Sequence, residues 1–205
     1  MELINLNGHF HTEYATDMTS MFGHCHRLVE LDVSNLSTQY VTSMYGMFTE
    51  CNLLEYLDVS HFDTSQVTSM YAMFNECTNM KELNVSKFDT SQVTNMAYMF
   101  CACENLVELD VSKFHTSNVE TMGWMFAYCT SLEQLNVSGF DTSQVTDMGE
   151  MFCDCKKLTA LDISNFDTSN VLNMEGMFSG CYCVSEADTA HFVIGQETDT
   201  SNMFG

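Results

Sequence analysis

The sequence predicts an α/β repeat solenoid built from 26-residue units, each with a short parallel strand and a short helix. The dipeptide Met-Phe recurs every 26 residues, and self-similarity at a fixed period of this size is typical of solenoids. It begins at positions 21, 47, 73, 99, 125, 151, 177 and 203. Cysteines keep the same spacing at 25, 51, 77, 103, 129, 155 and 181. We expect a single repeat domain over residues 1–205, of about eight units with irregular first and last units.

The strand of each unit is predicted from the tetrapeptide Leu-Asp-Val-Ser at residues 109–112. Its apolar and polar residues alternate, which is the pattern of a half-buried strand. Leu109 and Val111 are expected to face the core, while Asp110 and Ser112 face solvent. Equivalent tetrapeptides open at residues 31, 57, 83, 135 and 161. Stacked about 4.8 Å apart, these strands would form a parallel sheet along the solenoid.

The helix of each unit is predicted from the segment that carries the Met-Phe pair. Met122, Met125, Phe126 and Cys129 are spaced i, i+3, i+4 and i+7, which places them on one face of a helix. The Thr-Ser that precedes this segment suits a helix start. Each unit is therefore expected to run through strand, turn, extended Val-Thr segment and about two helical turns.

The full motif is Leu-Asp-Val-Ser-x-Phe-Asp-Thr-Ser-x-Val-Thr-x-Met-x-x-Met-Phe-x-x-Cys. It resembles the repeat of the BspA-type leucine-rich-repeat surface proteins, also known in mycoplasmas as a repeat domain of unknown function. The resemblance covers residues 3–205, with departures such as Leu36 for Phe and His115 for Asp. It implies a leucine-rich-repeat-like, right-handed coil and a cell-surface or secreted protein, credited in some members with adhesion. It carries no catalytic residues to this chain.

The charge balance limits the expected partners. The chain holds 28 acidic and only six basic residues, for a net charge of −22. Nucleic acids and anionic membrane surfaces are bound mainly through Lys and Arg, so both are disfavoured. No apolar run approaches the ~18 residues of a membrane span, and no leader peptide is visible. Together with what the resemblance implies, this leads us to expect a protein or glycan partner on a cell or matrix surface, and no cofactor.

The repeated cysteines are expected to be reduced and buried. A residue that repeats in phase with core Leu and Phe is most simply a small buried hydrophobic residue. Cys101, Cys153 and Cys183 lie outside this column and form Cys-x-Cys pairs with it. A spacing of two residues is neither that of a zinc finger nor that of an unstrained disulfide.

Two surfaces are the candidate binding sites. The first, called here the strand face, consists of outward residues of the predicted strands: Glu30, Asp32, Tyr56, Asp58, Glu82, Asn84, Glu108, Asp110, Gln134, Asn136 and Asp162. The second, called the aromatic strip, consists of Tyr45, Tyr71, Tyr98, Trp124 and Tyr128. Aromatic residues are favoured at protein interfaces. The alternatives are a merely solvated strand face and aromatic filler between stacked helices.

Three further columns carry alternative functions. The carboxylates of Asp63, Asp89, Asp141 and Asp167 could hold Ca²⁺ between units, although Asp-Thr-Ser after a strand is also typical turn chemistry. Regular threonines could order water on an ice-binding surface, or could bond the backbone of turns. They stand at 38, 64, 90, 116, 142 and 168, and again at 42, 68, 94 and 146.

The histidines of the first unit form a fourth candidate. His9, His11, His24 and His26 lie close together in sequence around Cys25, and imidazole with thiolate can hold Zn²⁺ or Ni²⁺. Exposed residues of an end unit are the simpler interpretation, and no metal site is assigned from the sequence.

The sequence thus predicts a non-enzymatic recognition scaffold that mediates adhesion or protein–protein interaction. No nucleophile elbow, phosphate loop or other catalytic motif is present in the sequence. The alternative is a structural protein that associates end to end, or an ice- or cation-binding solenoid.

Overall fold

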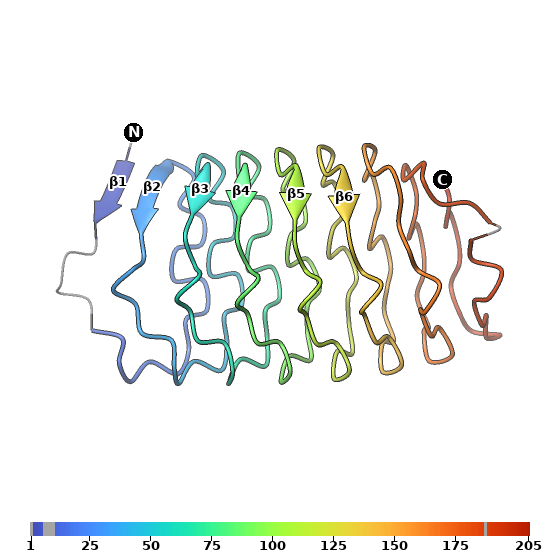
Figure 1. The fold of residues 1–205 in the computed structure, drawn as a ribbon, viewed down its shortest axis with the longest axis horizontal. Helices are drawn as coiled ribbons and strands as arrows, with labels where there is room; N and C mark the ends of the chain where they lie inside the picture. The colour runs from blue at the N-terminus through green and yellow to red at the C-terminus, as the bar shows by residue number, and fades with distance from the viewer. Residues whose placement is uncertain (1, 6–10, 187) are drawn as a thin grey trace.

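The chain forms a row of stacked coils. The computed structural model describes residues 2–5, 11–186 and 188–205. Successive coils lie side by side along the long axis, and the two termini lie toward opposite ends of the row (Figure 1). Parallel backbone bridges join Asp17 to Ser43, Ser43 to Ser69 and so on to Asp199, so each repeat of the sequence forms one coil.

In the described part of the chain, six short strands lie on one side of the row and point the same way (Figure 1). They are β1 (Glu2–Asn5), β2 (Leu28–Asp32), β3 (Tyr56–Leu57), β4 (Glu82–Leu83), β5 (Glu108–Leu109) and β6 (Gln134–Leu135). They pair in parallel as β1–β2, β3–β4 and β5–β6, rather than as the continuous sheet expected from the sequence.

The alternation predicted for the strands is confirmed. Leu109 and Val111 are 5% and 0% exposed, while Asp110 and Ser112 are exposed. In β3–β4, Leu57 pairs with Leu83 and Tyr56 with Glu82, so one buried and one exposed row run from coil to coil. The apolar row faces the core because only that side is covered by the rest of each coil.

The helix expected around the Met-Phe pair is wrong. Residues 123–128 form consecutive turns, and no helix occurs among the residues that the structure describes. Met125 N–H donates to the carbonyl three residues back, at Met122, whereas Phe126 N–H donates to Met151 in the next coil. An α-helix needs every N–H to bond four residues back. Here every second N–H group donates to a carbonyl of the neighbouring coil instead, so the segment forms a series of turns.

A left-handed backbone explains how these turns alternate. Trp124 and Tyr128 have φ values of 61° and 60°, and the equivalent residues of the other coils also have positive φ. Glycine occupies this conformation at Gly46, Gly176 and Gly180. A non-glycine residue in this region costs about 1–2 kcal/mol, which the regular hydrogen bonds to the next coil must offset.

Phenylalanine rings form the centre of the core. Phe22, Phe48, Phe74, Phe100, Phe126, Phe152, Phe178 and Phe204 stack in one continuous file. Neighbouring centroids lie 5.6–5.8 Å apart with interplanar angles of 2–21°. This spacing lies within the range of favourable offset stacking. The residues expected on the helix face, such as Met122 and Cys129, are fully buried around the file even though no helix carries them.

Buried hydroxyl groups bond each coil to the next. Thr90 is 0% exposed; its hydroxyl donates to the carbonyl of His115 at 2.9 Å and accepts that residue's N–H at 2.7 Å. Thr38, Thr64, Thr116, Thr142 and Thr168 make the same pair of bonds to the following coil. This column therefore satisfies backbone groups inside the fold and does not face solvent.

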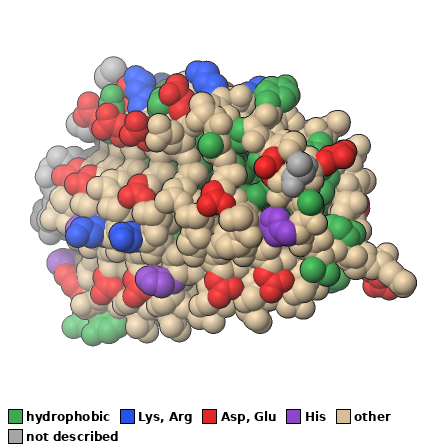
Figure 2. Space-filling view, turned by 45° about the vertical axis from the view of Figure 1, so that its right-hand side comes forward, with side chains coloured by type: hydrophobic (Ala, Val, Ile, Leu, Met, Phe, Trp, Pro, Cys, Tyr) green, Lys and Arg blue, Asp and Glu red, His purple; other side chains and the backbone are tan. Residues whose placement is uncertain are grey.

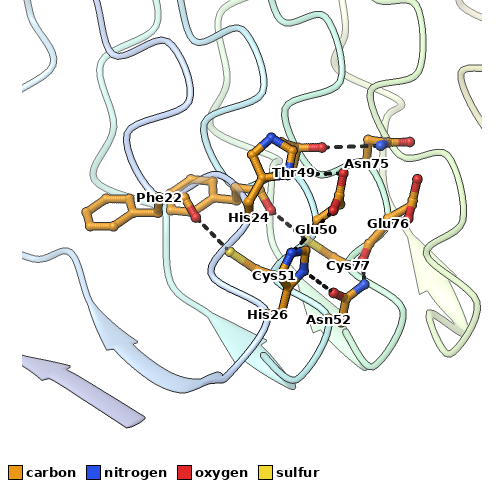
Figure 3. A network of polar contacts seen from close by, with 11 residues as sticks. Phe22, His24, His26, Thr49, Glu50, Cys51, Asn52, Asn75, Glu76 and Cys77 are labelled. Carbon is orange, nitrogen blue, oxygen red and sulfur yellow. Dashed lines mark hydrogen bonds and ion pairs between the residues drawn. The ribbon is translucent and has the colours of Figure 1, made fainter.

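The cysteine column is buried as expected from Cys51 to Cys181, whereas Cys25 in the first coil is only partly buried. The Cys51 thiol donates to the Phe22 carbonyl at 3.2 Å, and Cys77 donates likewise to Phe48 (Figure 3). Burial raises the pKa of Cys51 to about 12 and also raises that of Cys77. These thiols remain protonated at neutral pH, and their positions make them part of the packing.

Candidate functional site

All eleven residues predicted for the strand face are exposed. Ten of them come from β2 to β6 or directly follow β3 to β6, where the outward positions alternate with buried Leu and Val. Asp162 occupies the equivalent position one repeat after Asn136. Tyr56 is 55% exposed and lies opposite the acidic Glu82 of the next coil. The structure therefore brings the predicted residues together on one surface.

Two shallow grooves follow this surface. The larger has a volume of about 1030 Å³, and its lining includes Tyr56, Asp58, Glu82 and Asp110. The smaller, of about 430 Å³, is lined by Glu108, Asp110 and further residues that include Gln134 and Asn136. Open, polar grooves of this kind suit an extended contact with a macromolecule better than enclosure of a small ligand.

Some side chains of the strand face also accept hydrogen bonds from nearby backbone N–H groups. Asp162 Oδ1 accepts the hydroxyl of Ser164 at 2.7 Å and its backbone N–H at 3.1 Å, and these bonds lower the pKa of Asp162. Asp32, Asp58, Asn84, Asp110 and Asn136 accept the N–H two residues on in the same way. The outward residues that precede them, such as Glu82, make no such turn, so they are the more available for a partner.

On the face shown in Figure 2, acidic side chains are scattered widely and outnumber basic ones. On the strand face, Lys81 Nζ lies 2.6 Å from Glu55 Oε2, so that cation is paired within its own surface. The remaining carboxylates leave this face negative, as expected for a chain with 28 acidic and six basic residues. Such a field attracts cations and basic surfaces and repels polyanions.

The aromatic strip lies on the side of the coils formed by residues 123–128 and their equivalents, called here the turn side. Tyr45 and Tyr71 stack with centroids 4.6 Å apart, and Tyr98 and Trp124 stack at 5.5 Å. The strip lines a groove of about 670 Å³. The rings of these two pairs are nearly parallel, with interplanar angles of 13° and 8°, so one face of each ring packs against the other ring of its pair. This geometry favours the interpretation of the strip as packing between coils, with only part of each ring available to a partner.

The aspartates proposed as Ca²⁺ ligands serve as turn acceptors. Asp89 Oδ1 accepts the N–H of Ser91 at 2.9 Å, and this bond together with one from the Ser91 hydroxyl lowers the pKa of Asp89. Asp63, Asp141 and Asp167 accept the N–H two residues on in the same manner. The turn chemistry weighed at these positions is thus confirmed.

The histidines of the first coil separate into two groups. His24 and His26 lie against Glu50, with His24 Nδ1 3.1 Å from Glu50 Oε1 and His26 Nε2 3.6 Å from Glu50 Oε2. His11 instead lies 3.3 Å from Glu13, and His9 falls outside the described residues. Glu50 was missed by the sequence reasoning, which searched around Cys25 and not one repeat further on.

No helix that could cross a membrane occurs in the part of the chain that the structure describes. The fold, with the strand face on one side and the aromatic strip on another, defines a class of protein built from stacked coils of similar sequence. One family model matches residues 16–134 and residues 102–205, so the chain belongs to the family described as Mycoplasma protein of unknown function, DUF285. No curated protein matches the chain, and no solved structure matches it either.

Proposed function

We propose that this protein is a non-enzymatic recognition scaffold, of the surface-protein type known from BspA-like leucine-rich repeats. In this proposal the stacked coils are a right-handed solenoid. Its strands lie on one side, and the opposite side is formed by turns in place of helices. The protein acts from a cell surface or after secretion, and it mediates adhesion or protein–protein contact. The strand face is its contact surface.

One contrast between columns carries this proposal. The buried columns of Phe, Thr and Cys repeat nearly unchanged because each residue bonds or packs against a neighbouring coil. The column ahead of Leu-Asp-Val-Ser instead changes through Glu, Tyr, Glu, Glu and Gln along β2 to β6. These side chains are exposed over two grooves. Variation of exposed residues on a rigid frame is how repeat proteins present specific surfaces.

The charge of the strand face indicates the kind of partner. Glu82 and Glu108 stand on adjacent coils with no basic residue between them in that column. Carboxylates in this arrangement favour a protein partner with Lys or Arg at its contact surface, and the attraction should weaken with salt.

A charge-reversal experiment tests this proposal. The double variant Glu82→Lys/Glu108→Lys is compared with Glu104→Lys/Glu120→Lys, which makes the same change of net charge at exposed positions elsewhere. Binding to arrays of immobilised matrix proteins and glycans is measured at two salt concentrations. We expect the strand-face variant to lose at least about tenfold in affinity, because like charges across an interface repel. Equal losses in both variants would assign the binding to net charge alone and overturn the strand-face proposal.

End-to-end self-association is the second candidate function. Every coil repeats the same hydrogen bonds to the next, for example from Phe100 N–H to Met125 and from Phe126 N–H to Met151. A bonding pattern that repeats by translation can also join one molecule to another. Mass measurement across a concentration series separates the two candidates: a stable monomer favours recognition, and concentration-dependent fibres favour assembly.

The ice-binding and cation-binding alternatives have less support. The threonine column at Thr90 is buried, and the exposed column at Thr68 donates its hydroxyl to the Thr42 carbonyl at 3.1 Å. The aspartates are occupied by turn N–H groups. Measurements of thermal hysteresis and of Ca²⁺ binding by calorimetry test these two alternatives directly.

A further inference from the structure

The first two coils bring two imidazoles and a carboxylate together at one point of the turn side (Figure 3). His24 and His26 belong to the turn that follows the first Met-Phe pair, and Glu50 occupies the position of His24 one repeat later. The three ligand-bearing atoms all lie within 4.8 Å of one another. At the following coil boundaries the His24 position holds Glu76, Ala102 and other non-imidazole residues, so this combination is confined to the first boundary.

The backbone holds these side chains in place without any ion. His24 N–H donates to the Thr49 carbonyl and Glu50 N–H donates to the Asn75 carbonyl, each at 2.7 Å. Both residues have left-handed backbones, with φ values of 61° and 58°. The position of each Cβ is therefore set by the fold, and only side-chain torsions remain to be adjusted on binding.

The distances match a small tetrahedral ion. Glu50 lies 3.1 Å from His24 Nδ1 through one oxygen and 3.6 Å from His26 Nε2 through the other. Zn²⁺ with bonds of about 2.0–2.1 Å to nitrogen and oxygen holds neighbouring ligand atoms about 3.3 Å apart. Small side-chain movements would thus suffice to complete three bonds, and a water molecule would fill the fourth position.

Asn52 fixes the tautomer of the His26 ring, so that Nε2, the nitrogen nearer to Glu50, is the acceptor. Its Nδ2 donates to the Glu76 carbonyl at 2.9 Å, so its Oδ1 is turned toward His26 and lies 2.9 Å from Nδ1. An amide oxygen is only an acceptor, so Nδ1 carries the proton. Nε2 of this tautomer offers its lone pair on the side of Glu50 Oε2, 3.6 Å away, so both atoms can bind one cation.

This arrangement is the one found around metal-bound histidines. A ligating imidazole typically donates its other N–H to a carbonyl or carboxylate, which fixes the ring and its tautomer. Asn52 supplies that partner to His26. Two imidazoles with one carboxylate favour Zn²⁺ over Ca²⁺ or Mg²⁺, which take oxygen ligands.

We propose that His24, His26 and Glu50 form a Zn²⁺ site that joins the first coil to the second. The ion reaches it from solvent, because the three side chains are 61%, 54% and 29% exposed. Since ligands come from both coils, binding stabilises their contact, and the open fourth position allows a group from a partner to replace water. The site is separate from the strand face and does not depend on the function proposed for it.

Calorimetry of the whole chain with Zn²⁺ under reducing conditions tests the site. We expect one ion per chain and a Tm that rises with Zn²⁺ concentration, as linkage requires. The variant His24→Asn/His26→Thr should lose at least about 100-fold in affinity. Asn tolerates a left-handed backbone, and Thr already occupies the position of His26 at Thr78, so this variant keeps the fold. Asn52→Thr should lose about tenfold through the weakened support of His26.

The control variant His115→Asp removes an imidazole elsewhere and restores the residue usual in that column, so its affinity should not change. Replacement of Zn²⁺ by Co²⁺ should give a spectrum without a thiolate-to-metal charge-transfer band. No binding by the folded wild type, undiminished binding by His24→Asn/His26→Thr, or a thiolate band would each overturn the proposal. A thiolate band would assign the ion to cysteine ligands, of which the partly buried Cys25 and Cys183 are the more accessible.

Discussion

The turn side and the strand face belong to the same 26-residue units but use their residues differently. On the turn side, Phe100 packs between rings of both neighbouring coils, and its N–H bonds to Met125. On the strand face, Tyr56 and Glu82 stand side by side on strands only two residues long and project into solvent. Repetition therefore marks the residues that hold the coils together, whereas variation marks exposed residues that the contacts between coils do not constrain.

Removal of one phenylalanine ring from the stacked file should cause the largest loss of stability. We expect Phe100→Ala to lower the free energy of unfolding by about 3–5 kcal/mol, because the ring is fully buried and leaves a cavity. Tyr56→Ala, at a residue that is 55% exposed, should change it by no more than about 0.5 kcal/mol. Urea unfolding followed by circular dichroism measures both. Equal losses would mean that the two sides contribute alike.

Removal of a buried hydroxyl should have the next largest effect. Thr90→Val leaves both the N–H and the carbonyl of His115 without their partner, which costs about 1–3 kcal/mol. Thr68→Val, in the exposed threonine column, removes only one bond and leaves its carbonyl acceptor near water, so a loss below about 0.5 kcal/mol is expected. The same urea titration compares them, and a larger loss for Thr68→Val would reverse the roles assigned to the two columns.

Glycine substitutions should act with opposite sign on the two sides. Glu76 has φ 57°, and Glu76→Gly relieves about 1–2 kcal/mol of strain while it adds about 0.5–1 kcal/mol of chain entropy to the unfolded state. A net gain of about 0.5 kcal/mol is expected. Glu82→Gly in β4 brings only the entropic loss of about 0.5–1 kcal/mol. Differential scanning calorimetry measures the two Tm shifts, and a fall in both would contradict the strain at Glu76.

Acid should weaken the strand turns by a smaller amount. Bonds from Ser60, Ser112 and Ser164 lower the pKa values of Asp58, Asp110 and Asp162 below their usual 3.8. A group whose pKa is lowered on folding stabilises the protein above its unfolded pKa. That contribution is lost as the pH falls below about 4 toward the folded pKa.

The matched variant Asp58→Asn/Asp110→Asn/Asp162→Asn keeps the acceptor oxygens, as Asn84 and Asn136 already do, but does not titrate. Unfolding midpoints in urea at pH 7, 5 and 3 should fall less between pH 5 and 3 for this variant than for the wild type. Parallel pH profiles would show that other carboxylates dominate acid unfolding.

Burial could be predicted from the sequence, but the backbone hydrogen bonding of the Met-Phe segment could not. The inward Leu109 and Val111 and the buried Met122 and Cys129 all follow from apolar spacing, which reports the side that a residue faces. The spacing of Met122, Met125, Phe126 and Cys129 fits a helix, but equally fits turns in which alternate N–H groups bond the next coil. The left-handed backbone of Trp124 was not visible in that residue; the glycines at Gly46 and Gly176 in the same column were the available signal.

The candidate sites show the same limit. The strand face followed from alternation within one unit, so its exposed residues were predicted correctly. The cluster of His24, His26 and Glu50 depends on contact between units. Glu50 stands 26 residues after His24, and Asn52 stands 26 after His26. Reading across the repeat as well as along it would therefore have brought these four residues together.

The alternate bonding of the turn segments also determines how the molecule would respond to tension. Each coil contacts its neighbours alone, and bonds such as Phe100 N–H to Met125 O connect one coil to the next. A force applied between the two ends of the row therefore loads the coil boundaries in series. The chain would yield by peeling single coils, and each released unit of 26 residues would add about 90 Å of contour length. In the adhesive role proposed above, the protein would extend stepwise under shear and keep its remaining coils folded.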